Sequence, residues 1–467
     1  MTDSDSLHRT LSSRSITWFD RNILLPLADS ATGSRMMRRL RFLETAQFWP
    51  REHVEKEQAR LLREVLRIAY HEVPFYHELF DQHRINIDAI QTPADLSRLP
   101  IVTKEGFRKA PESSLQRPTG QKVYRAYTSG STGKNFFVFE DARTAGWYRA
   151  TFLLTLEWSG WNIGDRHIQT GMNLNRDFQR RTKDTLLRSY YVSAFDLSDR
   201  SLSAMLDIME RKNIRHVFGY PGSLYYLALQ AREVGWNTKL KSVVTWGDNL
   251  LPAHRRLIES TFGCKVYDSY GCAEGFQVAA QCGHGSDYHL HDFDVVVEFV
   301  RDNGLPTEPG ETGAVVVTRL VAGPMPLIRY RMGDAAVGGS PDICSCGRSL
   351  GRLTAIRGRE SDIIVTPDGN RLIVHFFTGI LEHFKEVDSF QVVQHELDAM
   401  TVNVVPSQPG WQASVGDRIR QSLLSKGANG MRITVQPVAA IPLTNAGKRR
   451  FVVAYTSPTK GSVRSNA

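Results

Sequence analysis

The chain has 467 residues, of which 41% are hydrophobic and 23% charged, the proportions of a soluble globular protein with a large core. This length exceeds the usual size of one domain, so two or more domains are expected. The net charge of +9 suits a protein that gathers polyanions. The sequence has no zinc-finger spacing, no RRM aromatic signature and no long basic tail, which argues against nucleic acid as a partner.

The sequence also bears on the cellular compartment. It contains no apolar run near the length of about 20 residues that a transmembrane helix needs. The N-terminus lacks the basic segment and apolar run of a secretory signal. Five unevenly spaced cysteines do not form a disulfide framework. We therefore expect a cytoplasmic protein without a transmembrane segment.

The N-terminal part of the chain has helical patterns. The basic run Arg35–Arg41 is expected to be a solvated helix face, and a segment that touches an anionic membrane is the alternative. Apolar residues recur with helical period from Glu52 to about Phe80. Further on, helical stretches alternate with short apolar runs at 216–218, 242–245 and 264–267. This alternation is typical of α/β layers.

The pattern becomes strand-rich after Asp292. Apolar runs at 295–300 and 313–318 predict a small β subdomain. We place a hinge near residue 360, where the pattern restarts. The predicted fold class is therefore α/β, with a large N-terminal domain at 1–358.

The last hundred or so residues have a pattern of their own. Alternating apolar residues predict strands at 390–394 and 401–405, and a helical period covers about 415–424. This combination predicts a small α+β domain at 359–467, which we expect to act as a mobile lid.

A short loop of hydroxyls and glycines ends in a lysine. Glycines let the backbone approach a ligand closely, N–H groups and hydroxyls donate to phosphate oxygens, and the lysine adds charge. It is not a Walker A loop, because only two residues separate Gly130 from Gly133. A plain surface turn is the alternative. The residues expected at a phosphate are Thr128, Ser129, Gly130, Ser131, Thr132, Gly133 and Lys134.

Further motifs follow the loop in a fixed order. They are Thr245–Asp248, Tyr270–Glu274, Tyr330–Asp334, Gly358–Asp362 and Pro442–Lys448. With the loop, they resemble the signatures of the adenylate-forming (acyl-CoA synthetase) superfamily. Further segments are Val73–Tyr76, Leu99–Lys104 and Gly219–Pro221. With these segments the chain looks most similar to the phenylacetate–CoA ligase branch, with its coenzyme F390 synthetase and capsule-biosynthesis relatives, over about residues 60–455.

The resemblance implies an enzyme that uses ATP to convert a carboxylic acid into an acyl-adenylate. CoA is the default acceptor of the acyl group. The resemblance gives Glu274 a magnesium-associated role and makes Lys448 the lysine that clamps the α-phosphate and the attacking carboxylate. A lysine on a flexible stem suits delivery by a mobile lid.

Other roles are implied in the same way. Asp334 would accept the ribose hydroxyls, and Arg359 would contact the ribose or phosphate. Asp362 looks like the hinge residue, although only the second acid of the family's GRxDD motif is retained here. Asp248 and Tyr270 are also assigned to the nucleotide site.

The residues of the acyl pocket are the hardest to identify from the sequence. Its candidate walls are Tyr220, Trp246 and Gly247, with Met172 and Phe276 as further candidates that are equally well explained as core residues. Aromatic walls would suit an aryl or other flat acid.

Cysteines and histidines suggest a structural metal. Two thiolates of a Cys-x-Cys pair, Cys344 and Cys346, could join Cys282 and one histidine in a tetrahedral zinc site. Such a site occurs in parts of the branch, where the histidine lies three residues before an aspartate. The resemblance therefore favours His289, three before Asp292, over His284 and His291. Unliganded cysteines in a loop are the alternative.

Two other functions stay open at this stage. One is an adenylating ligase with an amine or hydroxyl acceptor, in polysaccharide or secondary metabolism. The other is a non-catalytic nucleotide-binding homologue, which the retention of Glu274 and Lys448 disfavours. The sequence leaves open the acid, the acceptor and whether the chain forms a homodimer.

Overall fold

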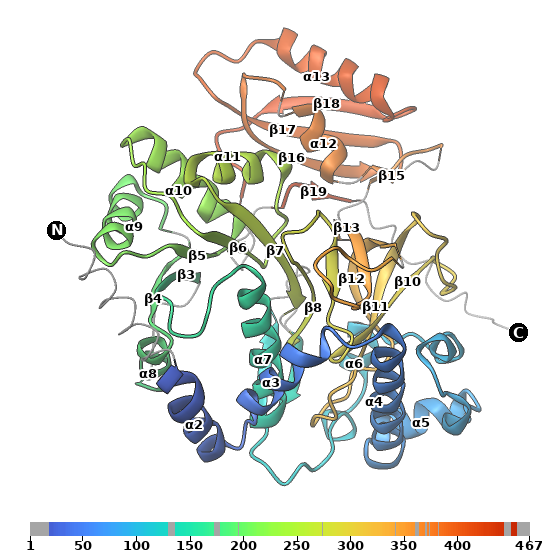
Figure 1. Cartoon of the computed structure of the whole chain (residues 1–467). Helices are drawn as coiled ribbons and strands as arrows, with labels where there is room; N and C mark the ends of the chain where they lie inside the picture. The colour runs from blue at the N-terminus through green and yellow to red at the C-terminus, as the bar shows by residue number, and fades with distance from the viewer. Residues whose placement is uncertain are drawn as a thin grey trace, which may run out of the picture. The chain divides into compact units, whose positions relative to one another are not determined.

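The computed structural model divides into a large unit that ends at Ala355 and a small unit from Ile356 onward, with Gly333–Ala335 grouped with the small unit (Figure 1). The description covers residues 18–128, 136–171, 178–194, 196–272, 274–340, 342–359, 364–368, 371–372, 374–381, 383–442 and 450–454.

Helices form the start of the large unit. The helical pattern from Glu52 to about Phe80 forms two helices, because Pro74 lacks an N–H and the preceding Val73 is extended, with φ −121° and ψ 105°. The N-terminal helices are η1 (Asp20–Leu24), α2 (Leu25–Thr32), α3 (Met36–Ala46), α4 (Arg51–Glu72), α5 (Pro74–Gln82), η2 (Ile87–Ala89), η3 (Pro93–Arg98), α6 (Lys104–Lys109) and η4 (Glu112–Ser114).

One arginine of α3 does not face solvent. Arg39 is 8% exposed, and its guanidinium donates to Asp294 Oδ1 at 2.9 Å and to the Phe293 carbonyl at 2.7 Å. It also lies 3.8 Å from the centre of the Trp147 ring. The prediction of a solvated basic face is wrong at this position, because an ion pair compensates the buried charge.

An eleven-stranded sheet crosses the large unit in the order β10-β11-β12-β13-β9-β8-β7-β6-β5-β3-β4. Strands β4, β3, β5, β6 and β7 pair in parallel, and the β7–β8–β9–β13 pairs are antiparallel. The strands are β3 (His167–Gly171), β4 (Ser189–Ser193), β5 (His216–Gly219), β6 (Ser242–Thr245), β7 (Lys265–Cys272), β8 (Phe276–Gln281), β9 (Tyr288–Leu290), β10 (Val295–Val300), β11 (Thr312–Arg319), β12 (Tyr330–Gly338) and β13 (Arg352–Arg359).

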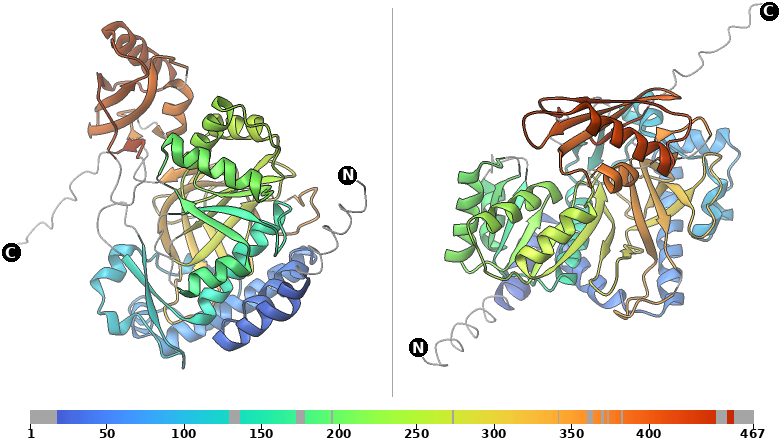
Figure 2. Two further views of the ribbon diagram at one scale, coloured as in Figure 1. Left: turned by 90° about the vertical axis from the view of Figure 1, so that its left-hand side faces the viewer. Right: turned by 90° about the horizontal axis from the view of Figure 1, so that it is seen from above.

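Helices cover the parallel part of this sheet. Helices α9, α10 and α11 share a core with β3, β5, β6 and β7, and they stay beside those strands when the molecule is turned (Figure 2). The helices between the parallel strands are α7 (Ala142–Trp158), α8 (Phe178–Leu186), α9 (Asp199–Arg211), α10 (Pro221–Glu233) and α11 (Pro252–Phe262).

A separate hairpin precedes α7. Strands β1 (Tyr124–Thr128) and β2 (Phe136–Glu140) pair antiparallel, and their last pair is Thr128 with Phe136. The loop predicted to bind phosphate therefore joins the two strands, and its residues 129–135 lie outside the described part of the chain.

The small unit has its own sheet and hydrophobic core. Its sheet has the order β18-β17-β16-β19, and β14 pairs with β15 as a short hairpin. The elements are β14 (Ile364–Val365), β15 (Arg371–Leu372), α12 (Val374–Leu381), β16 (Val387–Glu396), β17 (Ala399–Pro406), α13 (Ala413–Lys426), β18 (Arg432–Pro437) and β19 (Val452–Val453). The predicted α/β fold class with a small α+β unit is thus confirmed.

None of the helices within the described ranges is long and apolar enough to cross a membrane.

Candidate active site

Glu274 lies at the centre of a buried polar cluster. It occupies the turn between β7 and β8, and its side chain is 5% exposed. The Lys104 ammonium lies 2.9 Å from Glu274 Oε1, and the Tyr330 hydroxyl donates to the same oxygen at 2.7 Å. Three distant segments of the chain therefore meet at one carboxylate oxygen.

The environment keeps the Glu274 carboxylate charged. Burial alone would raise its pKa, but the Lys104 charge and the hydrogen bonds from Lys104 and Tyr330 outweigh burial. The pKa of Glu274 consequently lies below its ordinary value. A buried, ionised carboxylate of this kind is the ligand that Mg²⁺ prefers.

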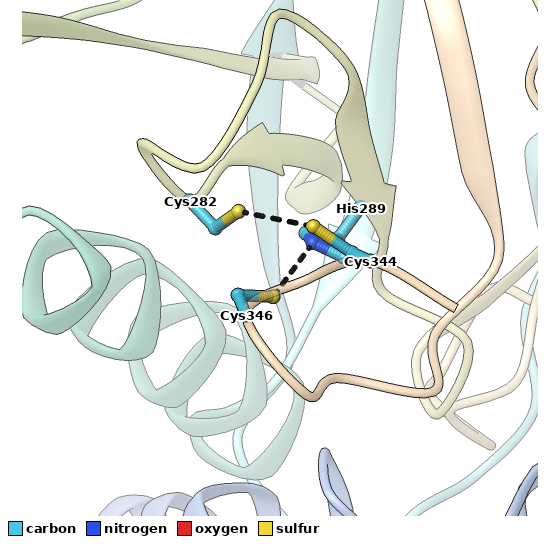
Figure 3. A group of neighbouring side chains, drawn as sticks. All are labelled: Cys282, His289, Cys344 and Cys346. Atoms are coloured by element: carbon cyan, nitrogen blue, oxygen red, sulfur yellow. Dashed lines mark hydrogen bonds between the residues drawn. The ribbon is translucent and has the colours of Figure 1, made fainter. Parts of the chain in front are cut away.

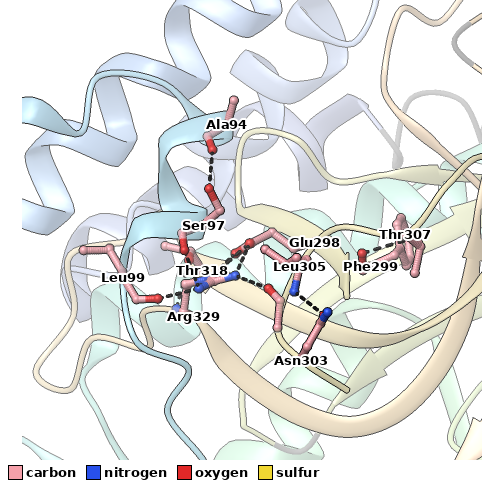
Figure 4. A network of polar contacts seen from close by, with 11 residues as sticks. Ala94, Ser97, Leu99, Glu298, Phe299, Asn303, Leu305, Thr307, Thr318 and Arg329 are labelled. Carbon is pink, nitrogen blue, oxygen red and sulfur yellow. Dashed lines mark hydrogen bonds and ion pairs between the residues drawn. The ribbon is translucent and has the colours of Figure 1, made fainter. Parts of the chain in front are cut away.

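Arg329 fixes the backbone that leads to Lys104 (Figure 4). Its side chain is 3% exposed and forms a fork with Glu298, with Nε 3.1 Å from both carboxylate oxygens. The same guanidinium donates to the carbonyls of Ser97 and Leu99. These contacts hold the segment before α6 against the β10–β12 region of the large unit.

The next residues complete this attachment. The Val102 N–H donates to the Arg329 carbonyl, and the Arg331 N–H donates to the Val102 carbonyl, both at 2.9 Å. The Thr103 hydroxyl then caps α6 by accepting from the Gly106 N–H at 3.1 Å. Lys104, the first residue of the helix, thereby has its backbone position set by β12.

An aromatic wall lies beside the Glu274 cluster. The Phe136 ring stacks on Tyr330 and on Phe107, with centroid distances of 6.3 and 6.0 Å. The Lys104 ammonium lies 5.9 Å from the centre of the Phe136 ring. Since Phe136 is the first residue after segment 129–135, the cluster adjoins the base of the predicted phosphate loop.

A second buried ion pair fixes the turn after Glu274. Arg319 is 1% exposed, and its guanidinium donates to Glu140 Oε1 at 2.6 Å and to the Gly275 carbonyl at 2.9 Å. Gly275 has φ +86°, and a Cβ there would lie 2.7 Å from Glu140 Oε1. Only glycine fits this turn, which links β2, β11 and the Glu274 segment.

The predicted acyl-pocket residues follow two parallel strands. Tyr220 comes directly after β5, and Trp246 and Gly247 come directly after β6. Gly247 has φ +77°, and a Cβ there would lie 2.7 Å from the Tyr220 ring. The Trp246 ring packs edge-on against Phe152 at 5.2 Å. The carboxyl ends of parallel strands are the usual ligand-binding edge of such sheets.

The remaining predicted site residues have varied positions. Asp248 is exposed and accepts from the Asn249 N–H at 2.8 Å. Tyr270 is buried on β7, and its hydroxyl points at the Met332 sulfur at 3.7 Å. Asp334 is buried on β12, in the stretch grouped with the small unit. Phe276 is a buried residue of β8.

Several predicted positions cannot be placed. For Thr128, which ends β1, and Arg359, which ends β13, only the backbone is described. Met172, Ser129, Gly130, Ser131, Thr132, Gly133, Lys134, Asp362 and Lys448 lie outside the described residues.

The four predicted metal ligands do come together (Figure 3). The ligand atoms of Cys282, His289, Cys344 and Cys346 all lie within 4.8 Å of one another. Cys282 Sγ is 3.8 Å from Cys344 Sγ, and Cys346 Sγ is 3.3 Å from His289 Nε2. Tetrahedral zinc with Zn–S bonds of about 2.3 Å gives sulfur–sulfur edges of about 3.8 Å. The four residues therefore fit a zinc ion.

The histidine of the cluster is in the protonation state of a metal ligand. Burial, with the charges of Arg348 and Arg352, lowers the pKa of His289 to about 4, so its imidazole is neutral as a metal ligand must be. His291, the alternative, is within 3.2 Å of the Thr155 hydroxyl and stacks on Trp158 instead.

Comparisons with known proteins give the family context. Residues 364–455 match the CapK C-terminal domain. A phenylacetate-coenzyme A ligase of Thermus thermophilus is 23% identical over 86% of this chain and 97% of its own. The CapK protein of Staphylococcus aureus is 22% identical over 81% of this chain and 84% of its own.

Solved structures agree in fold. A 2-hydroxyisobutyryl-CoA ligase in its postadenylation state has a TM-score of 0.71 at 19% identity, covering 87% of this chain and 91% of that one. The amide bond synthetase McbA of Marinactinospora thermotolerans has a TM-score of 0.53 at 18% identity, over 84% and 92%. Over most of its length the chain is therefore similar in sequence to phenylacetate-coenzyme A ligases and in fold to adenylate-forming ligases. These similarities support an AMP-forming ligase as the enzyme class.

Sequence reasoning missed several residues in and around the Glu274 cluster. Lys104 and Tyr330 stood inside quoted motifs but had no assigned role, and Arg319 and Glu140 stood in none. The position of Lys104 at the end of a segment typical of the branch was the one available signal.

Proposed function

We propose that this chain is an AMP-forming carboxylate–CoA ligase of the phenylacetate–CoA ligase type. It would activate a carboxylic acid with ATP to an acyl-adenylate and transfer the acyl group to CoA. The observation that carries the proposal is the buried, charged Glu274, whose partners Lys104 and Tyr330 both contact Phe136, the residue after the 129–135 loop. The relatives named as CoA ligases support the same acceptor.

The first half-reaction joins two anions, so the site must neutralise charge and align the reactants. Glu274 would hold Mg²⁺, which supplies charge neutralisation at the ATP phosphates when it is bound. The loop from Thr128 to Lys134 would donate to those phosphates. Asp334 and Arg359, with Asp248 and Tyr270, would bind the rest of the nucleotide.

The second half-reaction would use the small unit as a mobile lid. Lys448 would contact the α-phosphate and the attacking carboxylate during adenylation. Rotation about Asp362 would then withdraw it and admit CoA. The acyl group would lie against Tyr220, Trp246 and Gly247 at the ends of β5 and β6, where aromatic walls suit a flat acid.

The direct test is release of pyrophosphate from ATP across a panel of carboxylic acids, with and without CoA. We expect one class of aromatic acid to stimulate release and CoA to convert the adenylate to a thioester. Absence of any acid-dependent release would contradict the proposal.

An amine or hydroxyl acceptor is the second candidate. The similarity to an amide bond synthetase and to a CapK protein favours it. The same panel distinguishes the two, because an adenylate that CoA does not discharge but an amine or sugar hydroxyl does would favour this candidate.

We also propose that the cysteine–histidine cluster holds a structural zinc ion. All four positions are filled by protein ligands, so no position is left for a substrate. The ion would tie β9 and the loop after β8 to the segment 344–346.

The first prediction concerns this metal. Protein purified without chelator should contain about one zinc ion per chain, because a Cys3His set binds Zn²⁺ tightly. Cys344→Ser should lose the zinc and unfold at lower temperature, with a smaller change in adenylation. Cys264→Ser, a half-buried cysteine outside the cluster, is the matched control. Elemental analysis that finds no zinc in the parent protein would refute the site.

The second prediction concerns the turn after Glu274. Arg319→Met should destabilise the large unit by about 3–5 kcal/mol, because it leaves the buried Glu140 carboxylate without its cation. Denaturant unfolding measures the change. Arg301→Met removes an arginine that forms a comparable fork with Glu311 at the surface, and its unfolding midpoint should hardly move. Equal effects of the two variants would contradict the assignment.

A further inference from the structure

The Lys104 ammonium and the proposed Mg²⁺ would compete for the Glu274 carboxylate. The Glu274 cluster as it stands is neutralised by the Lys104 ammonium, 2.9 Å from Oε1. The proposed function requires Mg²⁺ at the same side chain. Two cations in contact with one buried carboxylate repel each other strongly where the dielectric is low. Lys104 and the metal therefore cannot both hold Glu274 at full strength.

The three members of the cluster differ in freedom to move. Tyr330 is fully buried and stacked on Phe136, so its hydroxyl holds Oε1 in a fixed direction. Glu274 has a side chain only 5% exposed. The Lys104 side chain is 26% exposed and carries its charge on a flexible four-carbon stem. Of the three side chains, that of Lys104 is therefore the one that can move away from Glu274.

The backbone of Lys104 is held in place, so only its side chain could move. The contacts of Arg329 and Val102 with the preceding segment, and the Thr103 cap, fix the start of α6. A change of partner would therefore be a rotation of the Lys104 side chain alone. Its ammonium already lies 5.9 Å from the centre of the Phe136 ring, next to the 129–135 loop. Phe136 is the residue that follows the predicted phosphate loop in the chain, so the ammonium already lies near the strand end to which that loop is joined.

We propose that Lys104 is an exchangeable counter-ion. Without nucleotide it neutralises Glu274, which as an unpaired buried carboxylate would be costly. When the magnesium nucleotide binds, Lys104 releases Glu274 and pairs with the nucleotide phosphates. This inference rests on the proposed function and assigns a ligand role to a residue outside the named motifs of the nucleotide site.

The proposed exchange of counter-ions predicts that one substitution, Lys104→Met, changes the affinities for two ligands in opposite directions. Lys104→Met removes the competing charge, so nucleotide-free protein should bind Mn²⁺, a stand-in for Mg²⁺, about tenfold more tightly. The same variant loses a charge-assisted phosphate contact, so Mg·ATP should bind about tenfold or more weakly. Electron paramagnetic resonance of free Mn²⁺ measures the first affinity, and isothermal titration calorimetry measures the second.

Three variants complete the design. Lys109→Met makes the same charge change in the last turn of the same helix, at an exposed position, and should alter neither affinity. Lys104→Arg keeps the charge and should retain most of the Mg·ATP affinity. The Mn²⁺ affinity gained in Lys104→Met should vanish in Lys104→Met combined with Glu274→Gln, which locates the gain at Glu274.

The outcomes separate this inference from the proposed function. If the parent protein does not bind Mg·ATP, the proposed function fails. If it binds Mg·ATP but Lys104→Met leaves both affinities unchanged, or weakens both together, the exchange is refuted and the pair is a fixed structural contact. If Lys104→Met does not fold, Lys104→Gln replaces it in both titrations, with the same outcomes deciding.

Discussion

Glu274→Gln is expected to lower acid-dependent pyrophosphate release by about a hundredfold or more. A neutral amide has the shape of the carboxylate but cannot hold a divalent cation at the phosphates. The loss should remain at saturating ATP and should not be restored by raising Mg²⁺. Steady-state kinetics of pyrophosphate release with the identified acid measures it.

The control for this variant is Glu112→Gln. Glu112 forms an exposed ion pair with Arg125 and lies outside the cluster. It makes the same chemical change at the surface and should leave the rate near that of the parent. Pyrophosphate release by Glu274→Gln close to that of the parent would show that the metal assignment is mistaken.

The sequence predicted elements whose local pattern determines them. The valine-rich run Val295–Val300 forms strand β10 because β-branched side chains fit a pleated, partly buried surface. The helix predicted at 415–424 forms as α13 because its apolar face covers the sheet of the small unit. The break at Pro74 could also have been read locally, since a proline ends the helix before it.

Pairings between distant residues could not be read in this way. Arg39 lies in a basic run that looks solvated, and its burial depends on Asp294, 255 residues away. The contact of Lys104 with Glu274 depends on Arg329 and Val102 attaching one loop to β12. Nothing in the local period of any of these segments specifies such a partner.

The cysteine–histidine cluster is an exception. Its four residues come from β9, from the loop after β8 and from the segment 344–346, yet the sequence predicted that all of them would come together. Cysteine is seldom placed in a polar loop without a chemical reason, and the resemblance supplied the choice of His289. Residue type carries information here that hydrophobic periodicity does not, because few side chains can bind a soft cation.

The largest effect on a single half-reaction is expected from Lys448→Ala. The lysine charge is needed while the carboxylate approaches the α-phosphate, and a contact of this kind made in the transition state is worth roughly 2.7–4 kcal/mol. Adenylate formation should therefore fall by a factor on the order of a hundred to a thousand. Transfer to CoA from chemically supplied acyl-AMP should change much less. Lys426→Ala, an exposed lysine at the end of α13, should affect neither step.

Asp362→Pro should produce the converse pattern. Proline fixes φ near −65° and so stiffens the proposed hinge, while the adenylation geometry needs no rotation of the lid. Adenylation should continue and transfer should stall, whereas Asp362→Ala, which leaves the backbone free to turn, should transfer far more effectively. Both steps are assayed separately in every variant with the identified acid. Because only alternation of the lid makes the two losses fall on different steps, equal loss of both steps in Lys448→Ala and in Asp362→Pro would eliminate it.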